Sequence, residues 1–267
     1  MMIRRLCVAF VIFAVVCSAV WACESVVKVE YDRGVYHIVL DGKKAARRIN
    51  FVFSEKLISN REAHVNYDSL LTVNTGFFDP KNQKTISYVK DRAGRELKAD
   101  ENENLLSNPV LVKNMDKLDS RAEFRVLRCG FRTRYEIVEH TAGVDEGCEI
   151  ETAAQGGPMI LPELRLEEEF FVLRDEQGKV VRESASVLHK CARTVFGLKG
   201  GDIHILIFTN ESPVDMFEVK AFCQKLGLER AMGFDGGSST SFNYEDLEVV
   251  SAKGSGRLLK SFMIFEK

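Results

Sequence analysis

Apolar and polar residues alternate along much of this chain with a period of two, which is typical of β-strands. Residues 26–40 contain two alternating runs around the turn Asp32-Arg-Gly34, and this arrangement predicts a hairpin. Residues 70–73 and 203–208 are apolar throughout, as expected for strands buried on both faces. Further strands are expected at residues 48–53, 86–90, 95–98, 109–113, 123–128, 135–139, 170–183 (a hairpin), 192–198 and 257–265.

One segment has the spacing of an amphipathic helix instead. Ser212 is the expected N-cap, Pro213 occupies the first helical position, and Gly227 ends the helix. The apolar stripe consists of Val214, Phe217, Ala221, Phe222 and Leu226. The patterns together predict an α+β fold: a single domain of mixed, largely antiparallel β-sheet with a few packed helices.

The chain has 267 residues, is 45% hydrophobic and carries a formal net charge of -2. This composition suits one large globular domain and argues against a protein that binds nucleic acid through bulk charge. We expect the main domain at residues 65–267. The strands within residues 23–64 either join its sheets or form a small separate lobe.

The first 22 residues have the pattern of a secretory signal peptide. A basic start (Arg4, Arg5) precedes an apolar run at residues 6–16, which is too short for a comfortable membrane span. Cleavage after Ala22 would leave Cys23 first, and the site resembles a lipoprotein signal in which that cysteine is lipidated. We therefore expect an exported protein that is periplasmic, secreted or at the cell surface, with a lipid anchor on Cys23 as an alternative to free release.

Export also decides how the cysteines are interpreted. Cys129, Cys148, Cys191 and Cys223 remain in the mature chain, and an oxidising compartment favours disulfides with three possible pairings. We favour Cys129–Cys148 and Cys191–Cys223. The five histidines are scattered and there is no CxxC pair, so a zinc site is not expected.

The strongest candidate site is the stretch at residues 231–240. A short apolar run would end at Phe234 and deliver Asp235 to the rim of a sheet. Gly236 and Gly237 allow positive φ, and successive N–H groups with the hydroxyls of Ser238 and Ser239 would form an anion-binding nest. The alternative is an ordinary strand-to-strand turn, because Asp-Gly is also a frequent hairpin signal.

Two further glycine-containing stretches contain polar side chains beside strands. Asn74, Gly76, Phe77 and Phe78 follow the buried strand at residues 70–73. The phenylalanines either fill the core or form an apolar wall under a sugar ring, with Asn74 bonding to the sugar hydroxyls.

The second stretch begins with Gln155 and continues through Gly157 to Pro158, in front of an apolar strand. Gln155 is either a core amide tied to the backbone or a site residue. The acidic runs at residues 100–103 and 167–169 are interpreted as solvated loops.

Arg193 lies among apolar residues in a predicted strand. A buried arginine is costly unless it is paired, so we expect it to face a carboxylate or an anionic ligand.

These stretches, in this order, resemble the phosphodiester glycosidase family, whose bacterial relatives are exported proteins linked to surface polysaccharide. The matching residues are Asn74-Thr-Gly-Phe-Phe78, Gln155-Gly-Gly-Pro158, Arg193-Thr-Val-Phe-Gly197 and the segment from Leu226 to Ser239. The resemblance extends over roughly residues 65–265. The family usually has Gly or Ala at the position of Thr75. The larger threonine of this chain would narrow the pocket or alter the substrate.

The resemblance implies hydrolysis of a sugar-1-phosphodiester at the anomeric C–O bond of an extracytoplasmic glycan or glycoconjugate. Asp235 would be the acid/base or stabilising carboxylate, and Arg193 with the backbone of residues 236–239 would bind the phosphate. Asn74 and Gln155 would orient the sugar. Gly76, Phe77, Phe78, Gly157, Gly236, Gly237, Ser238 and Ser239 complete the expected substrate-binding set.

Three questions stay open at this level. A second carboxylate is not identified, although Asp79 and Glu151 adjoin the motif segments. The sequence requires no cofactor, yet Asp235 could bind a divalent cation such as Ca²⁺. The alternatives to the glycosidase are an exported lipoprotein that binds glycans without turnover and a phosphodiesterase that cuts the P–O bond.

Overall fold

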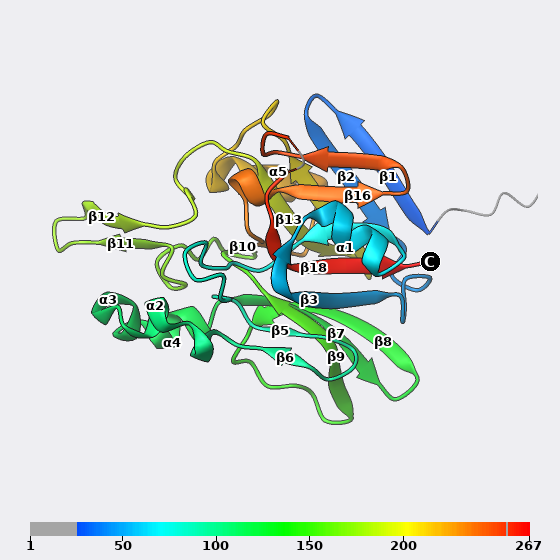
Figure 1. The fold of residues 1–267 in the computed structure, drawn as a ribbon, viewed down its shortest axis with the longest axis horizontal. Coiled ribbons are helices and arrows are strands. Elements are labelled where there is room, and N and C mark those ends of the chain that lie inside the picture. The colour runs from blue at the N-terminus through cyan, green and yellow to red at the C-terminus, as the bar shows by residue number, and fades with distance from the viewer. Residues whose placement is uncertain (1–25, 255) are drawn as a thin grey trace, which may run out of the picture.

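Three antiparallel sheets and a small hairpin make up most of the structure, a computed structural model that describes residues 26–254 and 256–267 (Figure 1). The expected signal peptide and Cys23 lie outside the described residues. The six-stranded sheet has the order β1 (Val27–Asp32), β2 (Val35–Leu40), β14 (Asp202–Phe208), β13 (Arg193–Lys199), β15 (Arg230–Gly233), β10 (Met159–Leu161).

The other two sheets have five strands each. The β18 sheet has the order β17 (Leu247–Val250), β16 (Ser241–Tyr244), β4 (Ser69–Asn74), β18 (Leu259–Glu266), β3 (Ile49–Ile58). The β7 sheet has the order β6 (Glu96–Leu97), β5 (Val89–Lys90), β9 (Cys148–Gln155), β7 (Ala122–Cys129), β8 (Arg132–Glu139). The separate hairpin is β11 (Val172–Arg174) and β12 (Val180–Glu183). Thus β1 and β2 pair into the six-stranded sheet and β3 into the β18 sheet, so the N-terminal strands share the sheets of the rest of the chain.

One central core joins the three sheets, and the alternation of side chains explains how. In β13, Phe196 points into the central core, whereas its neighbour Val195 packs on the opposite face beneath α5 (Met216–Leu226). The same alternation separates Ile205 from Leu206 in β14. A continuous apolar run is therefore required here, because both faces of these strands are covered.

Helix α5 begins three residues later than its sequence pattern suggests. Asp215, and not Ser212, is the N-cap, and its carboxylate accepts from the N–H groups of Phe217 and Glu218. Glu218 completes a capping box by accepting from the Asp215 N–H. The helix ends as expected at Gly227, which has φ +71°. Phe217 was expected in the apolar stripe but is 56% exposed.

The other helices are short, and two local expectations were wrong. Residues 109–113 were expected as a strand but contain α3 (Pro109–Val112), because Asn108 caps its N–H groups and Pro109 takes the first helical position. Residues 100–103, expected as a loop, contribute to the turn η1 (Ala99–Glu101) and to α2 (Glu103–Leu106). The remaining elements are α1 (Asn60–Asn66), α4 (Met115–Asp119) and the turn η2 (Gly237–Ser239).

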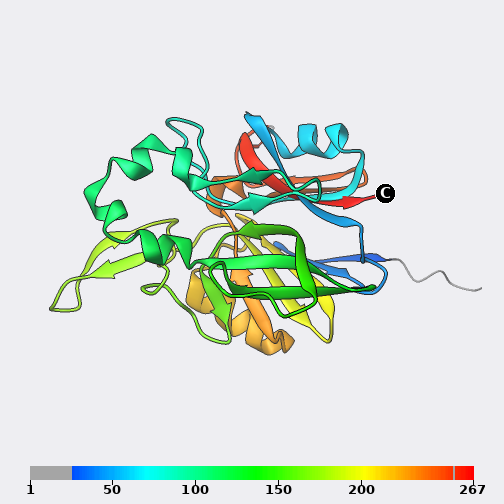
Figure 2. The same ribbon diagram turned by 90° about the horizontal axis from the view of Figure 1, so that it is seen from below.

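Helices α2–α4 and the hairpin β11–β12 project together from one end of the molecule, opposite the end where the C-terminus and the start of β1 lie (Figures 1 and 2). A small cluster containing Leu105, Leu118 and Phe170 holds the projecting elements together. No helix within the described ranges combines the length and the apolarity needed to cross a membrane.

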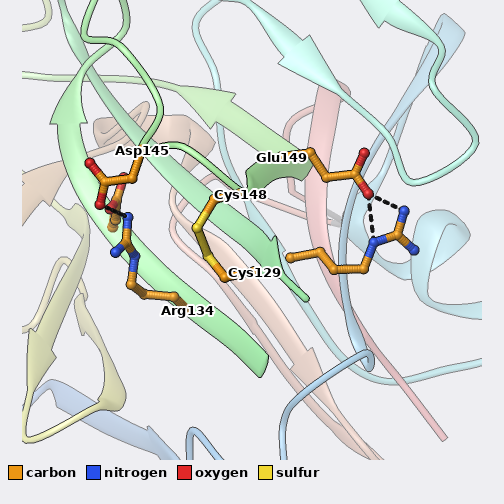
Figure 3. The surroundings of a disulfide bond; sticks show 7 residues. Cys129, Arg134, Asp145, Cys148 and Glu149 are labelled. Carbon is orange, nitrogen blue, oxygen red and sulfur yellow. Dashed lines mark hydrogen bonds and ion pairs between the residues drawn. A yellow bond between two sulfur atoms is a disulfide. The ribbon is translucent and has the colours of Figure 1, made fainter. Parts of the chain in front are cut away.

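The two cysteine expectations had different outcomes. Cys129 and Cys148 form a disulfide between the paired strands β7 and β9, with Cα atoms 4.1 Å apart, beside the ion pair of Arg134 with Asp145 (Figure 3). The Cys191–Cys223 pairing was wrong, because both residues are free thiols. Cys223 is fully buried inside α5, where it packs in the apolar cluster under the six-stranded sheet.

Candidate functional site

The four segments singled out in the sequence meet through their backbones around Asp235. Asp235 follows β15, and its N–H donates to the carbonyl of Thr75 at 3.0 Å. The other links join the same segments: Phe234 N–H to Thr194 O (2.9 Å), Gly237 N–H to Ala192 O (2.7 Å), Gly157 N–H to Gly233 O (2.8 Å) and Gly233 N–H to Pro158 O (2.9 Å). The site is therefore assembled by long-range contacts among loops at the ends of β4, β9, β13 and β15.

Asn74 holds two of these segments together. Its side-chain Nδ2 donates to the carbonyl of Asp235 at 2.6 Å, and its Oδ1 accepts from Thr194 Oγ1 at 2.7 Å and from Ser241 N at 3.1 Å. The residue is 1% exposed. Asn74 thus fixes the backbone that presents Asp235, and its position indicates a support for the site more than a contact with a sugar.

The side-chain amide of Gln155 also forms its hydrogen bonds within the protein. Nε2 donates to the carbonyls of Leu118 and Asp119, each at 3.0 Å, and Oε1 accepts from the N–H of Tyr88 at 3.2 Å. Of the two uses considered for this amide, the contacts match the core amide tied to backbone. They attach the C-terminal end of α4 to β9 and so hold the projecting elements beside the motif segments.

Arg193 does not pair with a carboxylate among the described residues, which was one of the two expectations for it. Its guanidinium donates to backbone carbonyls, from Nε to Val214, from NH1 to Ala185 and from NH2 to Ser186 and His189, at 2.7–3.1 Å. The side chain is buried, and this burial lowers its pKa. Arg193 therefore clamps residues 185–189 and Val214 against β13, next to Gly236.

Asp235 lies at the centre of the cluster, and the residue as a whole is partly exposed. Loss of hydration raises its pKa to about 6, and the Ser239 hydroxyl, the charge of Arg257 and the Gly236 N–H oppose that rise. A carboxyl group with this pKa exchanges a proton near neutral pH. A raised carboxyl pKa of this kind is common among catalytic acids and bases, which makes Asp235 the candidate reactive group of the cluster.

The two glycines after Asp235 serve close packing and a tight turn. A Cβ on Gly236 would lie 3.0 Å from the carbonyl of Ala192, and Gly237 has φ +59°. Most N–H groups of the expected anion-binding nest already form hydrogen bonds within the protein. Those of Gly237, Ser239 and Thr240 donate to the carbonyls of Ala192, Gly236 and Gly237, respectively. The exposed Ser238 hydroxyl remains on the solvent side.

Both phenylalanines of the first motif are buried, as the core interpretation requires. Phe77 packs against Phe171 with ring centroids 5.7 Å apart. Phe78 belongs to the cluster beneath α1, and the guanidinium of Arg257 lies 5.1 Å from its ring centroid. Gly76 is required for space, since a Cβ there would meet Ser87 Cβ at 2.8 Å.

The interpretation of residues 167–169 as a solvated loop was wrong for Glu169. This side chain is fully buried, and its oxygens accept from the N–H groups of Met159 (2.9 Å) and Ala122 (3.2 Å). Burial raises its pKa to about 7 despite these bonds. It also contacts Gly157, where a Cβ would lie 2.4 Å from Glu169 Oε2. The adjoining pair Phe170-Phe171 was the available signal that this acid enters the core.

Arg257 is the site residue that sequence reasoning missed. It stands just before β18, and the sequence pattern there predicted only a strand at residues 257–265. Neither proposed second carboxylate is free: Asp79 accepts from Asn104 Nδ2 at 2.9 Å, and Glu151 pairs with Arg92 at 3.2 Å.

Solvent reaches the cluster from the side where Ser238 is exposed. Behind Asp235 lies a narrow cavity lined by Phe77, Gly157, Arg193 and Gly236, among others. A surface groove of about 790 Å³ is lined by the turns around Gly42 and Gly201 with Tyr135 and does not include Asp235. Across residues 26–254 and 256–267, no three His, Cys, Asp or Glu side chains gather as a metal site would require.

Comparison with known structures supports the fold. The catalytic domain of zebrafish N-acetylglucosamine-1-phosphodiester α-N-acetylglucosaminidase, auto-inhibited by its pro-peptide, superposes with a TM-score of 0.62 at 12% identity, over 90% of this chain and 81% of that one. A hypothetical protein from Synechocystis gives a TM-score of 0.56 at 12% identity, over 89% and 61% of the two chains. A Burkholderia pseudomallei protein described as exported gives 0.54 at 11% identity, over 87% and 74%.

The sequence was compared with curated proteins and with models of protein families, and the two comparisons gave different results. No curated protein sequence matches the chain at a significant level. The family model for phosphodiester glycosidases, however, matches residues 67–265, which is well over half of the chain and includes all four converging segments. The chain therefore belongs to the phosphodiester glycosidase family.

Proposed function

We propose that this protein hydrolyses a sugar-1-phosphodiester at the anomeric C–O bond, with Asp235 as the catalytic carboxylate. The observation that carries the proposal is the convergence of four separate segments on Asp235, a partly exposed residue whose carboxyl pKa is raised to about 6. Membership of the family and the fold shared with the zebrafish glycosidase support the same reaction class.

The reaction places modest demands on the protein. The oxygen of water bonds to the anomeric carbon, the C–O bond to phosphate breaks, and its electron pair stays on the phosphoryl oxygen. Asp235 accepts one proton from the water, and the other hydrogen remains on the new sugar hydroxyl. The leaving phosphate monoester has a second pKa near ~6, so it departs with little help from a general acid. A single catalytic carboxylate is then sufficient.

The supporting residues keep this carboxylate in place. Asn74, at the end of β4, bonds to the carbonyl of Asp235, and Arg193, in β13, holds residues 185–189 beside Gly236. We place the substrate on the solvent side, over Ser238. The protein is proposed to act on an exported glycan or glycoconjugate, which is consistent with the signal-like N-terminus and with the exported Burkholderia relative. The reaction as proposed needs no cofactor.

The test compares Asp235→Asn with the matched control Asp246→Asn, whose side chain is exposed in the β16–β17 turn. On a p-nitrophenyl sugar-phosphodiester, Asp235→Asn should lower kcat by about 10²–10⁴-fold, the range for a lost general base, and Asp246→Asn should change nothing. In the wild type kcat/KM should rise through about pH 6, because only the ionised carboxylate accepts a proton.

Two other outcomes separate the alternatives. Hydrolysis in ¹⁸O water should place the label in the sugar; label in the phosphate would identify a phosphodiesterase that cuts the P–O bond. Saturable glycan binding without turnover would identify a glycan-binding protein instead. Equal rates for folded wild type and Asp235→Asn would remove Asp235 from the mechanism.

A further inference from the structure

The proposed reaction requires a cation for the phosphate, and the cations near the site are mostly engaged. Arg193 donates hydrogen bonds to four backbone carbonyls. Lys260 is buried and donates to the carbonyl of Glu55 at 2.6 Å. Lys84 pairs with Glu101 at 3.5 Å. An anion at any of these groups would compete with a contact that the group already makes.

Arg257 differs from them in its contacts. Its NH1 donates to Ser238 Oγ at 2.9 Å, and its guanidinium carbon lies 5.1 Å from the centroid of the Phe78 ring. In the part of the chain that the structure describes, it forms no ion pair with any carboxylate. The side chain is partly exposed, so its remaining N–H donors can be reached by a ligand.

Arg257 also has an electrostatic connection to the catalytic group. Among the described residues, the positive charge that lowers the pKa of Asp235 is that of Arg257. The interaction places the guanidinium close enough to act on charge that develops beside Asp235. Phe78 supports the guanidinium through a cation–π contact and so restrains its orientation.

We infer that Arg257 and Ser238 form the phosphate subsite next to Asp235 and hold the phosphoryl group of the substrate. This inference rests on the proposed function. The planar guanidinium offers two N–H donors along one edge to the phosphate oxygens. Ser238, which already accepts from Arg257, is free to donate its own hydroxyl hydrogen.

The subsite would decide the class of substrate. A sugar joined to phosphate places a negative charge beside Arg257, whereas an ordinary neutral glycoside places none. Arg257 would also stabilise the phosphate as the electron pair of the broken C–O bond moves onto it. The enzyme would therefore prefer anionic phosphodiesters to neutral glycosides of the same sugar.

The first measurement is a binding titration that does not depend on turnover. The full chain is titrated with inorganic phosphate at constant ionic strength, and binding is followed by NMR shifts. We expect Arg257→Ala to weaken binding by about 10- to 100-fold, as for loss of charge-assisted hydrogen bonds, and Arg257→Lys to recover part of it. Arg132→Ala, an exposed arginine at the start of β8, is the matched control and should bind like wild type.

The second measurement is the pKa of the Asp235 carboxyl group, followed by ¹³C NMR. Arg257→Ala should raise this pKa, because it removes a charge that lowers it. Phosphate bound to the wild type should also raise it, since the anion offsets the guanidinium. Equal phosphate affinity in wild type and folded Arg257→Ala would overturn the subsite, whatever the activity.

Kinetics then separate the two proposals. Well above pH 6, where Asp235 is ionised in both enzymes, Arg257→Ala should raise KM or lower kcat far more for a sugar-phosphodiester than for the neutral p-nitrophenyl glycoside. If phosphodiester hydrolysis is unaffected by Arg257→Ala, the subsite fails while the proposed function stands. If wild type binds phosphate through Arg257 but hydrolyses no phosphodiester, the proposed function fails while the subsite stands.

Discussion

Replacing Arg193 by alanine should destabilise the protein strongly, because this side chain is a structural clamp. Its guanidinium is 4% exposed and donates four hydrogen bonds to carbonyls of residues 185, 186, 189 and 214. The substitution would leave these carbonyls without their donors and open a cavity beside Gly236. Two of the clamped residues, Ala185 and Ser186, have positive φ and depend on such contacts.

The magnitude follows from the number and burial of these bonds. A hydrogen bond from a charged group contributes about 1.5–3 kcal/mol, but four such bonds do not add in full, and the cost of burying the guanidinium offsets part of the sum. We expect a loss of about 3–5 kcal/mol, because each buried carbonyl left without a donor costs about 1–3 kcal/mol. In urea, with a slope of about 3 kcal/mol per M for a chain of this size, the midpoint should fall by about 1–1.7 M.

The assay is urea unfolding followed by circular dichroism, with Arg257→Ala as the matched comparison. Arg257 is partly exposed and makes one hydrogen bond and one ring contact, so its loss should cost less than about 1 kcal/mol. If Arg193→Ala does not fold, Arg193→Lys, which keeps the charge with a single donor group, should show an intermediate loss. A midpoint for Arg193→Ala within about 0.3 M of wild type would refute the clamp.

Two further predictions concern the backbone and the histidines. Gly157→Ala should lower Tm far more than Gly237→Ala, because both have positive φ but only at Gly157 would a Cβ collide, 2.4 Å from Glu169 Oε2; equal losses in a thermal melt would contradict this account. His37 Nε2 and His204 Nδ1 lie 2.8 Å apart, and burial with the neighbouring ring lowers the pKa of His204 to about 4. Between about pH 6.5 and 4 the unfolded chain therefore binds a proton at His204 that the folded chain does not bind, so the free energy of unfolding should fall as pH drops through this range. In urea titrations His204→Asn should make the free energy of unfolding depend less on pH. An unchanged pH dependence would argue against the pair.

Local pattern identified many elements correctly. The hairpin at residues 26–40, the doubly buried strand at 203–208 and the end of α5 at Gly227 all follow from side-chain period and turn chemistry. These features depend on residues within a few positions of one another, so they can be predicted from the local sequence pattern. Residues 109–113 show the limit of this approach, since Asn108 and Pro109 start a helix that four apolar-looking residues did not reveal.

The sequence by itself also located the four segments that meet at the site, and it singled out Asp235 among them. Tertiary structure alone decided which polar groups are available there. Asn74, Gln155 and Arg193 have the residue types of a binding site, yet their hydrogen bonds go to the protein's own backbone. The partners of Asn74 and Gln155 are distant in the sequence, and those of Arg193 lie in Val214 and in a loop that folds back on β13. Whether a polar side chain supports the fold or faces a ligand depends on partners brought together by sheet pairing, and no local pattern records those partners.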